Sequence, residues 1–529
     1  MMQTFLGKAL SEFYSFPALI SLIAVLLMFW FVLVGRPMFA PPGPLGVPIF
    51  GYAPFVGKYP WIALTKLKEA YGQIVGLYLG SRFAVVLEDY DTVHTAFVDQ
   101  GDVFAGRGEN FVLEKMATGK DGRGIHGITA MEGPKWKDTR EFIVTTLHEL
   151  GAGQGKQKME KIVLDEVDRL SRTIAAHNAW AFNPRTLLRP AMASIMAMVL
   201  FSRRFQYEGD EFRCLMEHMP DAIGAMGSVT INAFHWLRYI PGCFKRHWNG
   251  MIRTVDNLRA FVENEMTNRE KEMEFTLIEN STNKAEPKDF LDAYFRHINS
   301  EGAKQSLAMT DGNDFVASAS TMFIGGTEST TLGLQWLILL MCRNPVHQQK
   351  IQEEMNRVIG HKRFVGWDDR AAGLMVDDLP LTTATFLECL RLSGLSAGNI
   401  PRRNLEATEL LGYKIPKHSL IFANIWSIHN DPQYFPDPLA FKPDRFLDGE
   451  GNVNIPDQFM PFSIGQRSCP GQALAQMALF LTFANLVHRF EWKEPKGATL
   501  PRINEFGPAS LAATPAPYKV HAVPRFTFL

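Results

Sequence analysis

Hydrophobic positions recur at helical spacing along most of the chain. Apolar residues three or four positions apart share one face of a helix, because an α-helix has 3.6 residues per turn. This spacing predicts helices in five long segments, which are Met159–Ala176, Met251–Glu274, Asp314–Cys342, Val346–Ile359 and Gly471–His488. We therefore expect a mainly α-helical body.

Alternation of apolar and polar positions is restricted to short stretches. GQIVGLYLG and RFAVVLED alternate on either side of a turn at Gly80 and Ser81, which is typical of two paired strands. Glycine and proline punctuate a second strand-like stretch at Leu411–Phe422, and short strand-like runs return near the C-terminus. The polar segment Glu279–Lys288 is expected to be a surface loop. The predicted fold class is mainly α with a minor β part near each end.

One apolar run near the N-terminus differs from the others because it contains no charge. Pro17–Val34 would span about 27 Å as a helix, close to the ~30 Å hydrocarbon thickness of a bilayer. A cleaved signal peptide is the alternative, but its apolar region is usually about 7–15 residues long and follows a positive segment. Here Lys8 is offset by Glu12. We therefore expect residues 1–36 to form a single membrane anchor in contact with lipid.

A proline-rich spacer is predicted after this run, over residues 37–50. Prolines at such density prevent a continuing helix and favour a stiff, extended chain. Arg36 directly follows the apolar run, which favours a cytoplasmic C-terminal side. Residues 51–529 contain no long linker, low-complexity tract or internal repeat, so we expect them to form one catalytic domain.

Charge and cysteine content exclude several classes of function. The chain has 529 residues with 54 basic and 55 acidic side chains, so no overall field would attract nucleic acid. Its five cysteines contain no C-x-x-C pair, which argues against a disulfide framework or a structural zinc site. In a reducing compartment a cysteine ordinarily packs as a small hydrophobic residue.

One cysteine lies in a context that indicates chemistry. The segment FSIGQRSCPG places Phe462, Gly465, Arg467 and Gly471 around Cys469. Glycines let the backbone turn tightly and approach a ligand closely. A helical pattern begins after the second glycine, which puts the sulfur near a helix N-terminus, where an anion is stabilised. A buried structural cysteine in a glycine-rich turn is the alternative, and it does not require these five residue types at these offsets.

This segment resembles the signature F-x-x-G-x-R-x-C-x-G of the cytochrome P450 family at every fixed position. The resemblance implies the fold of that family and a haem b cofactor. It implies that Cys469 is the proximal ligand of the iron, in a turn formed with Phe462, Gly465 and Gly471. It also implies that Arg467 contacts a haem propionate.

Further segments are similar to family motifs, in the family's order. Trp136 and Arg140 match a W-x-x-x-R pair that contacts the propionates, although such a pair alone would be an ordinary helix face. Arg402, in GNIPRR, is similar to another propionate contact. Glu388-Cys-Leu-Arg391 matches E-x-x-R, and FKPDRF resembles the P-E-R-F element, whose arginine is Arg445 here. In the family these last three side chains lock together beneath the haem.

Another similar segment is GGTEST, residues 325–330, within a predicted apolar helix. Paired glycines weaken a helix and allow a local kink, or else permit close helix packing. In the family the kink makes room for O2, and an acid and an alcohol deliver protons. Glu328 and Ser329 match that catalytic pair. Serine replaces the more usual threonine and lacks the methyl group that restricts the threonine rotamer. We therefore expect proton delivery to be less tightly coupled to substrate oxidation.

The resemblance, with HWLRYIPGCFKRHW at 235–248, points to the microsomal, family-two-like branch of animal enzymes. It implies a haem-thiolate monooxygenase that inserts one atom of O2 into a steroid, a fatty acid or a xenobiotic. No G-x-G-x-x-G fingerprint is found, so NADPH would act indirectly, through a partner reductase. The implied location is the endoplasmic reticulum membrane, crossed once, with the catalytic domain in the cytoplasm. By the same analogy, substrate contacts are expected from Asn110–Ile128, Phe315–Phe323, Ala397–Ile400 and Ser510–Leu511.

Two other functions remain as alternatives. A haem-thiolate isomerase would rearrange peroxides without external electrons, but loss of the acid–alcohol pair would mark it, and Glu328 and Ser329 are present. A non-catalytic haem-binding or sensor protein of the membrane would not need that acid. Dependence of turnover on a reductase distinguishes these possibilities.

Overall fold

A computed structural model gives the structure of the protein. The residues that it describes are 17, 19–29, 35–108, 110–119, 122–152, 156–177, 180–279, 286–300, 306–361, 363–370, 379–395, 397–507 and 512–526.

Helices make up most of the described body, which confirms the predicted fold class. The helices are α2 (Pro60–Tyr71), α3 (Tyr90–His94), α4 (Phe111–Ala117), α5 (Gly133–Leu147), α6 (Lys156–Ala176), α7 (Arg185–Phe201), α8 (Asp210–Met216), α9 (Met219–Gly227), α10 (Val229–Ala233), α11 (Cys243–Glu279), α12 (Phe290–Ile298), α13 (Gly312–Arg343), α14 (Pro345–Val358), α15 (Pro380–Ser393), α16 (Ile425–His429) and α17 (Gln472–Arg489). The five segments predicted from helical spacing correspond to α6, α11, α13, α14 and α17.

A five-stranded sheet forms the larger β part, in the order β1-β2-β7-β4-β3. Its strands are β1 (Ile74–Leu79), β2 (Arg82–Leu87), β3 (Gly106–Arg107), β4 (Arg402–Arg403) and β7 (Leu420–Ala423). β1 and β2 are the predicted antiparallel pair, and β7 joins β2 in parallel. Two hairpins complete the β structure, β5 (Thr408–Leu410) with β6 (Tyr413–Ile415), and β8 (Phe490–Lys493) with β9 (His521–Pro524).

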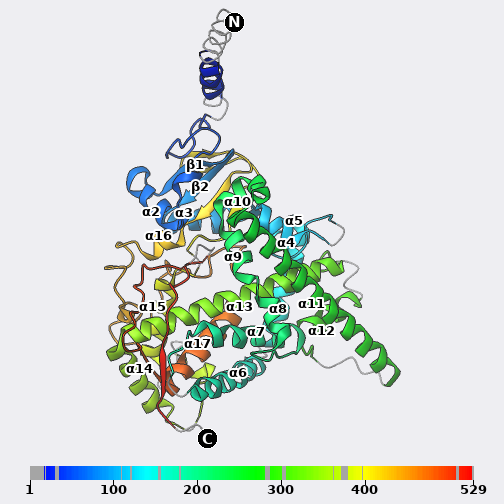
Figure 1. The fold of residues 1–529 in the computed structure, drawn as a ribbon, viewed down its shortest axis with the longest axis vertical. Helices are drawn as coiled ribbons and strands as arrows, with labels where there is room; N and C mark the ends of the chain where they lie inside the picture. The colour runs from blue at the N-terminus through cyan, green and yellow to red at the C-terminus, as the bar shows by residue number, and fades with distance from the viewer. Residues whose placement is uncertain are drawn as a thin grey trace, which may run out of the picture.

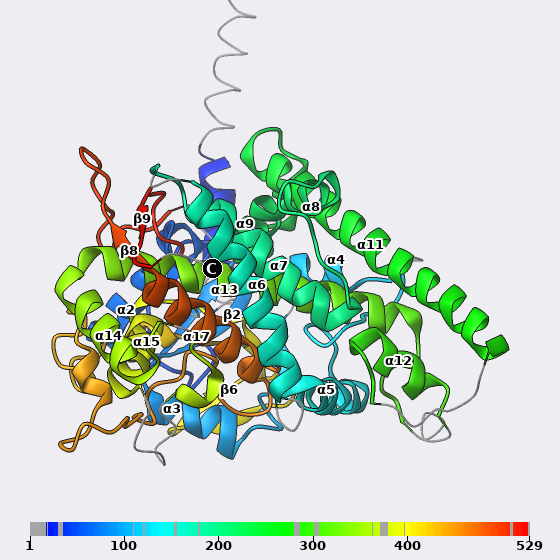
Figure 2. The ribbon, with the colours of Figure 1, turned by 90° about the horizontal axis from the view of Figure 1, so that it is seen from below.

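Helix α13 crosses the centre of the body and packs against α7, α15 and α17 (Figure 1). Its N-terminus is capped by Asp311, whose side chain accepts a hydrogen bond from the Asn313 amide. Nearly all of its C-terminal half is buried, including Trp336, as expected for a helix with apolar residues on every face. Figure 2 shows the long helix α11 extending along one side of the body.

The N-terminal prediction falls only partly on described residues. Residues 19–29 are helical, and every side chain in that stretch is exposed, while residues 1–16, 18 and 30–34 lie outside the described part. Among the residues described, no helix is both long enough and apolar enough to cross a membrane. The predicted loop Glu279–Lys288 also lies largely outside, because residues 280–285 are not described.

Candidate active site

A cavity of about 400 Å³ lies between the middle of α13 and the turn that precedes α17. On the α13 side its wall includes Thr321, Gly325 and Ser329. On the opposite side it includes Phe462 and Cys469. The cavity therefore brings together two of the segments that the sequence singled out.

Cys469 is surrounded by protein on most sides, yet its side chain is exposed because it faces the cavity. Its amide donates to the Phe462 carbonyl at 3.0 Å, which closes the turn before α17. Burial raises the pKa of the Cys469 thiol, while the Gly471 backbone and Arg140 act in the opposite direction. A soft sulfur ligand is thus available at the cavity wall, with a cation beside it.

Glycine occupies positions 465 and 471 of this turn for different structural reasons. Gly465 adopts a φ of 74°, and a Cβ atom there would lie 1.9 Å from the Phe97 carbonyl oxygen. Only glycine fits that position. Gly471 caps α17 and lines the cavity, where a Cβ would meet no atom of the described residues within 4 Å apart from its chain neighbours. The surrounding protein therefore does not require glycine at 471, whereas a flat group bound in the cavity would.

Arg467 is the best-anchored cation of the cavity wall. Its guanidinium donates to the backbone carbonyls of Ala105 and Met131 at 2.8 and 2.7 Å. Burial, followed by the charge of Arg107, lowers its pKa. Because a guanidinium stays protonated, this shift indicates positive charge that the surrounding protein does not fully balance.

Arg140 also lines the cavity, and its guanidinium donates to the Ser468 hydroxyl at 3.2 Å. Arg402 does not reach the cavity wall. It is 1% exposed and stacks 3.4 Å from the Phe97 ring centroid, and its Nε and one terminal nitrogen have no partner among the residues that the structure describes. Burial lowers the pKa of Arg402 as well.

The arginines therefore fit the carboxylates of a haem. Several guanidinium groups lie around one cavity, and Arg402 behind its wall has two nitrogens without a partner among the described residues. The Nε1 of Trp136, which lines the cavity, also has no acceptor in the described part of the chain. Buried donors without acceptors are costly, and an anionic group in the cavity would satisfy them. On these contacts the residues present suit haem b, with Cys469 as the iron ligand.

The predicted ion-pair cluster of Glu388, Arg391 and Arg445 is present. Glu388 is fully buried and accepts from Arg391 at 2.7 Å and from Arg445 at 3.2 Å. Arg391 also donates to the His429 carbonyl at 2.6 Å, which ties α15 to the end of α16. The three charged side chains therefore have a structural role.

Helix α13 is continuous from Gly312 to Arg343 across its paired glycines. A Cβ on Gly326 would lie 2.2 Å from the sulfur of Met196, so the Met196 side chain of α7 packs directly on this glycine. Gly325 faces open space at the cavity wall. The two glycines thus serve separate needs, one for packing and one for room in the cavity.

The predicted acid and alcohol face different surroundings. Ser329 lines the cavity, and its hydroxyl donates to the Gly325 carbonyl at 2.6 Å. Glu328 is not part of the cavity wall. Its carboxylate is held by two cations of α7, with Arg185 at 2.7 Å and Arg189 also in contact. Only the alcohol of the pair therefore borders the cavity directly.

Three of the four expected substrate segments reach the cavity. They contribute Leu113, Met116, Ile128, Thr321, Met322, Asn399 and Ile400, while Ser510–Leu511 lies outside the described residues. The sequence reasoning missed Arg107, whose Nε donates to the Thr129 carbonyl at 2.9 Å. It also missed the methionines of α7 and α9, Met192, Met196 and Met226. No local motif distinguishes these residues.

Comparisons with known proteins agree with this geometry. Residues 41–522 match the protein-family model described as Cytochrome P450. Cytochrome P450 2U1 of Bos taurus is 31% identical over 509 residues, which cover 91% of this chain and 88% of that protein. Cytochrome P450 2C44 of Mus musculus is 33% identical over 495 residues, with 92% and 93% covered. Cytochrome P450 2B15 of Rattus norvegicus is 28% identical over 492 residues, with 92% and 93% covered.

Proposed function

Because the chain belongs to the cytochrome P450 family, it is a monooxygenase, and we propose that Cys469 provides the iron ligand in the cavity below α13. Its cofactor is haem b and its co-substrate is O2. Bound haem supplies the centre at which O2 is reduced and one oxygen atom is transferred. The observation that carries the assignment is the Cys469 side chain, which faces the cavity beside Arg140.

The cationic residues would bind the haem propionates. Arg140 and Arg467 line the cavity, and Arg107 joins them there. Arg402 lies behind the wall, and within the described ranges two of its nitrogens and the indole N–H of Trp136 have no acceptor. Charge-assisted hydrogen bonds from these groups to carboxylates would compensate the buried positive charge.

Ser329 would deliver protons to the reacting oxygen. Its hydroxyl now donates to the Gly325 carbonyl and must rotate to donate into the cavity. Serine has no β-methyl group and rotates more freely than threonine. This freedom lets the hydroxyl turn into the cavity, but it couples proton delivery less tightly to substrate oxidation. Glu328 would relay the replacement proton: its carboxylate must leave Arg185 and Arg189, take up a proton from water and pass it to Ser329, a change that costs two ion pairs.

A lipophilic substrate suits the cavity. Aliphatic and thioether side chains make up most of its wall, and its methionines are Met116, Met192, Met196, Met226 and Met322. Methionine is flexible and polarizable, so such walls adapt to ligands of different shape. A steroid, a fatty acid and a xenobiotic each fit these properties.

Electrons would come from an NADPH-dependent diflavin reductase on the same membrane. Lys137 of α5 is 57% exposed and is a candidate contact with that partner. Lys135 is a weaker candidate, because its ammonium lies 2.7 Å from the buried carboxylate of Asp314. The test is a turnover screen of lipids, sterols and foreign compounds with reductase present. Oxidation that depends on the reductase supports the proposal, whereas turnover of peroxides without it would favour an isomerase.

We also propose that the protein is held in the endoplasmic reticulum membrane by one N-terminal span, with the catalytic domain on the cytoplasmic side. Exposed apolar side chains support a second contact with lipid. Phe39 and Ile49 of the spacer are 63% and 65% exposed, and Trp236 and Tyr239 of the 235–248 segment are 50% and 68% exposed. Exposed aromatic and aliphatic groups of this size favour a membrane interface.

A further inference from the structure

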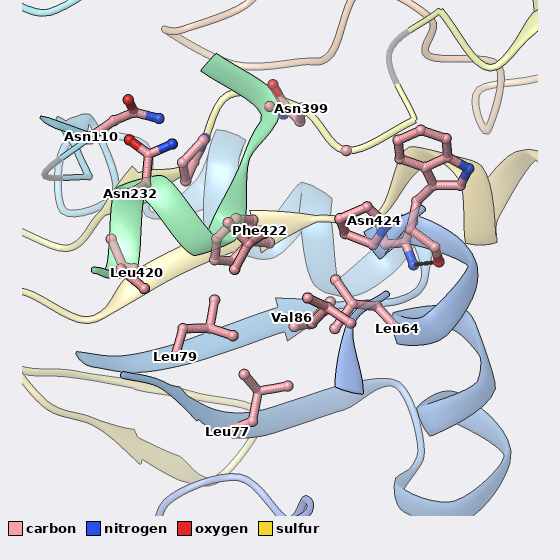
Figure 3. A pocket seen from close by; sticks show the side chains of 18 of the residues that line it. Leu64, Leu77, Leu79, Val86, Asn110, Asn232, Asn399, Leu420, Phe422 and Asn424 are labelled. Atoms are coloured by element: carbon pink, nitrogen blue, oxygen red, sulfur yellow. Dashed lines mark hydrogen bonds between the residues drawn. The ribbon is translucent and has the colours of Figure 1, made fainter. Parts of the chain in front are cut away.

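Thioether side chains gather in the wall of the cavity that Cys469 faces. Helices α4, α7, α9 and α13 each contribute methionine to it, and the residues are Met116, Met192, Met196, Met226 and Met322. A smaller cavity between the five-stranded sheet and the helices α9 and α10 has a different wall (Figure 3). Its labelled side chains are aliphatic, aromatic or amide groups, and Met226, which both cavities share, is the one methionine among its described lining residues. Sulfur is therefore concentrated where the proposed function places the reduction of O2.

Met196 of α7 has a sulfur atom whose position is tied to the middle of α13. A Cβ atom on Gly326 would lie 2.2 Å from its Sδ and 2.7 Å from its Cε, so the end of the side chain lies directly against that residue. The preceding residue, Gly325, lines the cavity, and its carbonyl accepts the Ser329 hydroxyl at 2.6 Å. The sulfur therefore lies beside the part of α13 from which a proton is expected to reach the reduced oxygen.

The same cavity is where hydrogen peroxide would form. Ser329 is expected to couple proton delivery loosely, so part of the O2 reduced at the haem would be released as peroxide. Peroxide released there meets the cavity wall before it meets bulk solvent. A thioether is readily oxidised to a sulfoxide, whereas aliphatic side chains and hydroxyl groups are inert to peroxide. The methionines are therefore the reactive groups of this wall.

We propose that Met196 is an oxidation site, at which hydrogen peroxide from unproductive turnover forms methionine sulfoxide. The sulfur attacks one oxygen of the peroxide, and an S–O bond forms as the O–O bond breaks. The second oxygen leaves with both hydrogens as water, so the sulfur loses the two electrons that the peroxide gains. The proposal rests on the proposed reduction of O2 in this cavity and needs no other reagent.

The sulfoxide would disturb the contact between α7 and α13. Met196 is 5% exposed and packs on Gly326, so the added oxygen has little room there. A sulfoxide is polar, and burial of a polar group without a partner is unfavourable. Helix α7 also holds Glu328 through Arg185 and Arg189, so displacement of α7 from α13 would alter the position of this carboxylate. Oxidation of Met196 is therefore expected to weaken ligand binding and to slow turnover.

The test uses the full-length, haem-loaded protein with reductase and NADPH but without substrate. Catalase in the solution destroys peroxide that escapes, so oxidation inside the cavity remains. Tandem mass spectrometry should find an added oxygen at Met196 roughly tenfold more often than at Met198 or Met38. Met198 lies on the same helix and is more exposed than Met196, but it is not among the described residues of the cavity wall. Met38 is 77% exposed and reports peroxide in bulk solution.

A crossed experiment should reverse this order of oxidation. An iron-binding azole fills the cavity, and hydrogen peroxide is added to the solution. Met38 and Met198 should then be oxidised, while Met196 should stay reduced because the azole excludes peroxide from it. Oxidation of Met196 to the same extent in azole-filled and azole-free protein would show that it does not receive peroxide from the cavity, which would overturn the proposal.

Met196→Leu and the matched variant Met198→Leu test the consequence of oxidation. After turnover without substrate, the wild type and Met198→Leu should bind the azole at least about fivefold more weakly than before turnover. Met196→Leu should keep its own initial affinity, which also shows that the variant is folded. An equal loss of affinity in Met196→Leu would contradict the role of this residue.

Failure of the proposal can be distinguished from failure of the proposed function. Peroxide production that leaves Met196 reduced, or that oxidises Met198 equally in the presence of catalase, overturns the oxidation site alone. A turnover mixture that forms no peroxide contradicts the loose coupling expected from Ser329, and with it the source of the oxidant.

Discussion

The guanidinium of Arg467 lies 3.5 Å from the centroid of the Trp136 ring. These two residues come from distant segments, and both were predicted from the sequence to bind the same cofactor. A cation above an indole face is stabilised by the ring quadrupole, more strongly when both are buried. The contact therefore holds a charged side chain in place at the cavity before any ligand is present.

Replacement of Ser329 by alanine is expected to waste electrons. The variant lacks the hydroxyl that would deliver protons from the cavity wall, so oxygen reduced at the haem would leave more often as peroxide. We expect several-fold more hydrogen peroxide per NADPH consumed, measured with saturating reductase. Ser329→Thr adds the missing methyl group and should lower peroxide below the wild-type value.

Thr331→Val is the matched control for that experiment. Thr331 lies on the same helix and its hydroxyl donates to the Thr327 carbonyl at 2.6 Å, but it does not line the cavity. Its replacement should leave the coupling of electrons to product unchanged. Equal coupling in Ser329→Ala and the wild type would count against the proton-delivery role.

Replacement of Arg445 by leucine should destabilise the folded protein. Glu388 is fully buried, and loss of Arg445 leaves its charge with Arg391 alone. We expect a decrease of about 3 kcal/mol in the free energy of unfolding, measured by urea denaturation, because breaking a buried ion pair is costly. Arg363→Leu removes the exposed partner of Asp369, at 2.5 Å, and should cost less than about 1 kcal/mol because the arginine of this pair lies in water. Similar losses for the two variants would contradict the structural role of Arg445.

Glu88 should make stability dependent on pH. Burial raises its pKa to about 7 from an ordinary 4.5, so the folded state holds the proton more tightly than the unfolded chain. Its contribution favours folding below pH 4.5 and is lost as pH rises through 7. At about 1.4 kcal/mol per pKa unit, the loss approaches ~3 kcal/mol by pH 8.

Glu88→Gln removes this titration. Relative to the wild type, the variant should gain about 2 kcal/mol more stability at pH 8 than at pH 5, measured by denaturation at both values. Glu491→Gln, at an exposed position, serves as the control and should leave the pH dependence unchanged. A Glu88→Gln variant with the wild-type pH dependence would show that Glu88 is ionised at neutral pH.

The second membrane contact can be tested in a protein that lacks residues 1–36. Changing Trp236, Tyr239 and Ile240 to serine removes three exposed apolar side chains. Binding to phospholipid vesicles should fall at least tenfold, because each large side chain contributes about 1.5–3 kcal/mol when buried. Trp180→Ser, at a 78% exposed residue between α6 and α7, should leave binding unchanged. Full binding by the triple variant would end this assignment.

The elements that could be predicted from the sequence are those with local signals. Helical spacing located α13 and α17 within a few residues, and the turn at Cys469 was recognisable because its neighbours stand at fixed offsets. Side-chain direction could not be predicted in this way. Neither the turn of Glu328 toward Arg185 nor the packing of Met196 on Gly326 has a local signal, because each depends on how α7 docks against α13. Arg107 was missed for the same reason.

The central claim is that the Cys469 sulfur binds the haem iron, and the carbon monoxide difference spectrum of the reduced protein tests it most directly. The wild type should show the band of a thiolate-ligated haem, and Cys469→Ser should lose it. Cys342→Ser and Cys389→Ser alter buried cysteines away from the cavity and should each keep the band. A protein without porphyrin, or a thiolate band that survives in Cys469→Ser, would contradict the account.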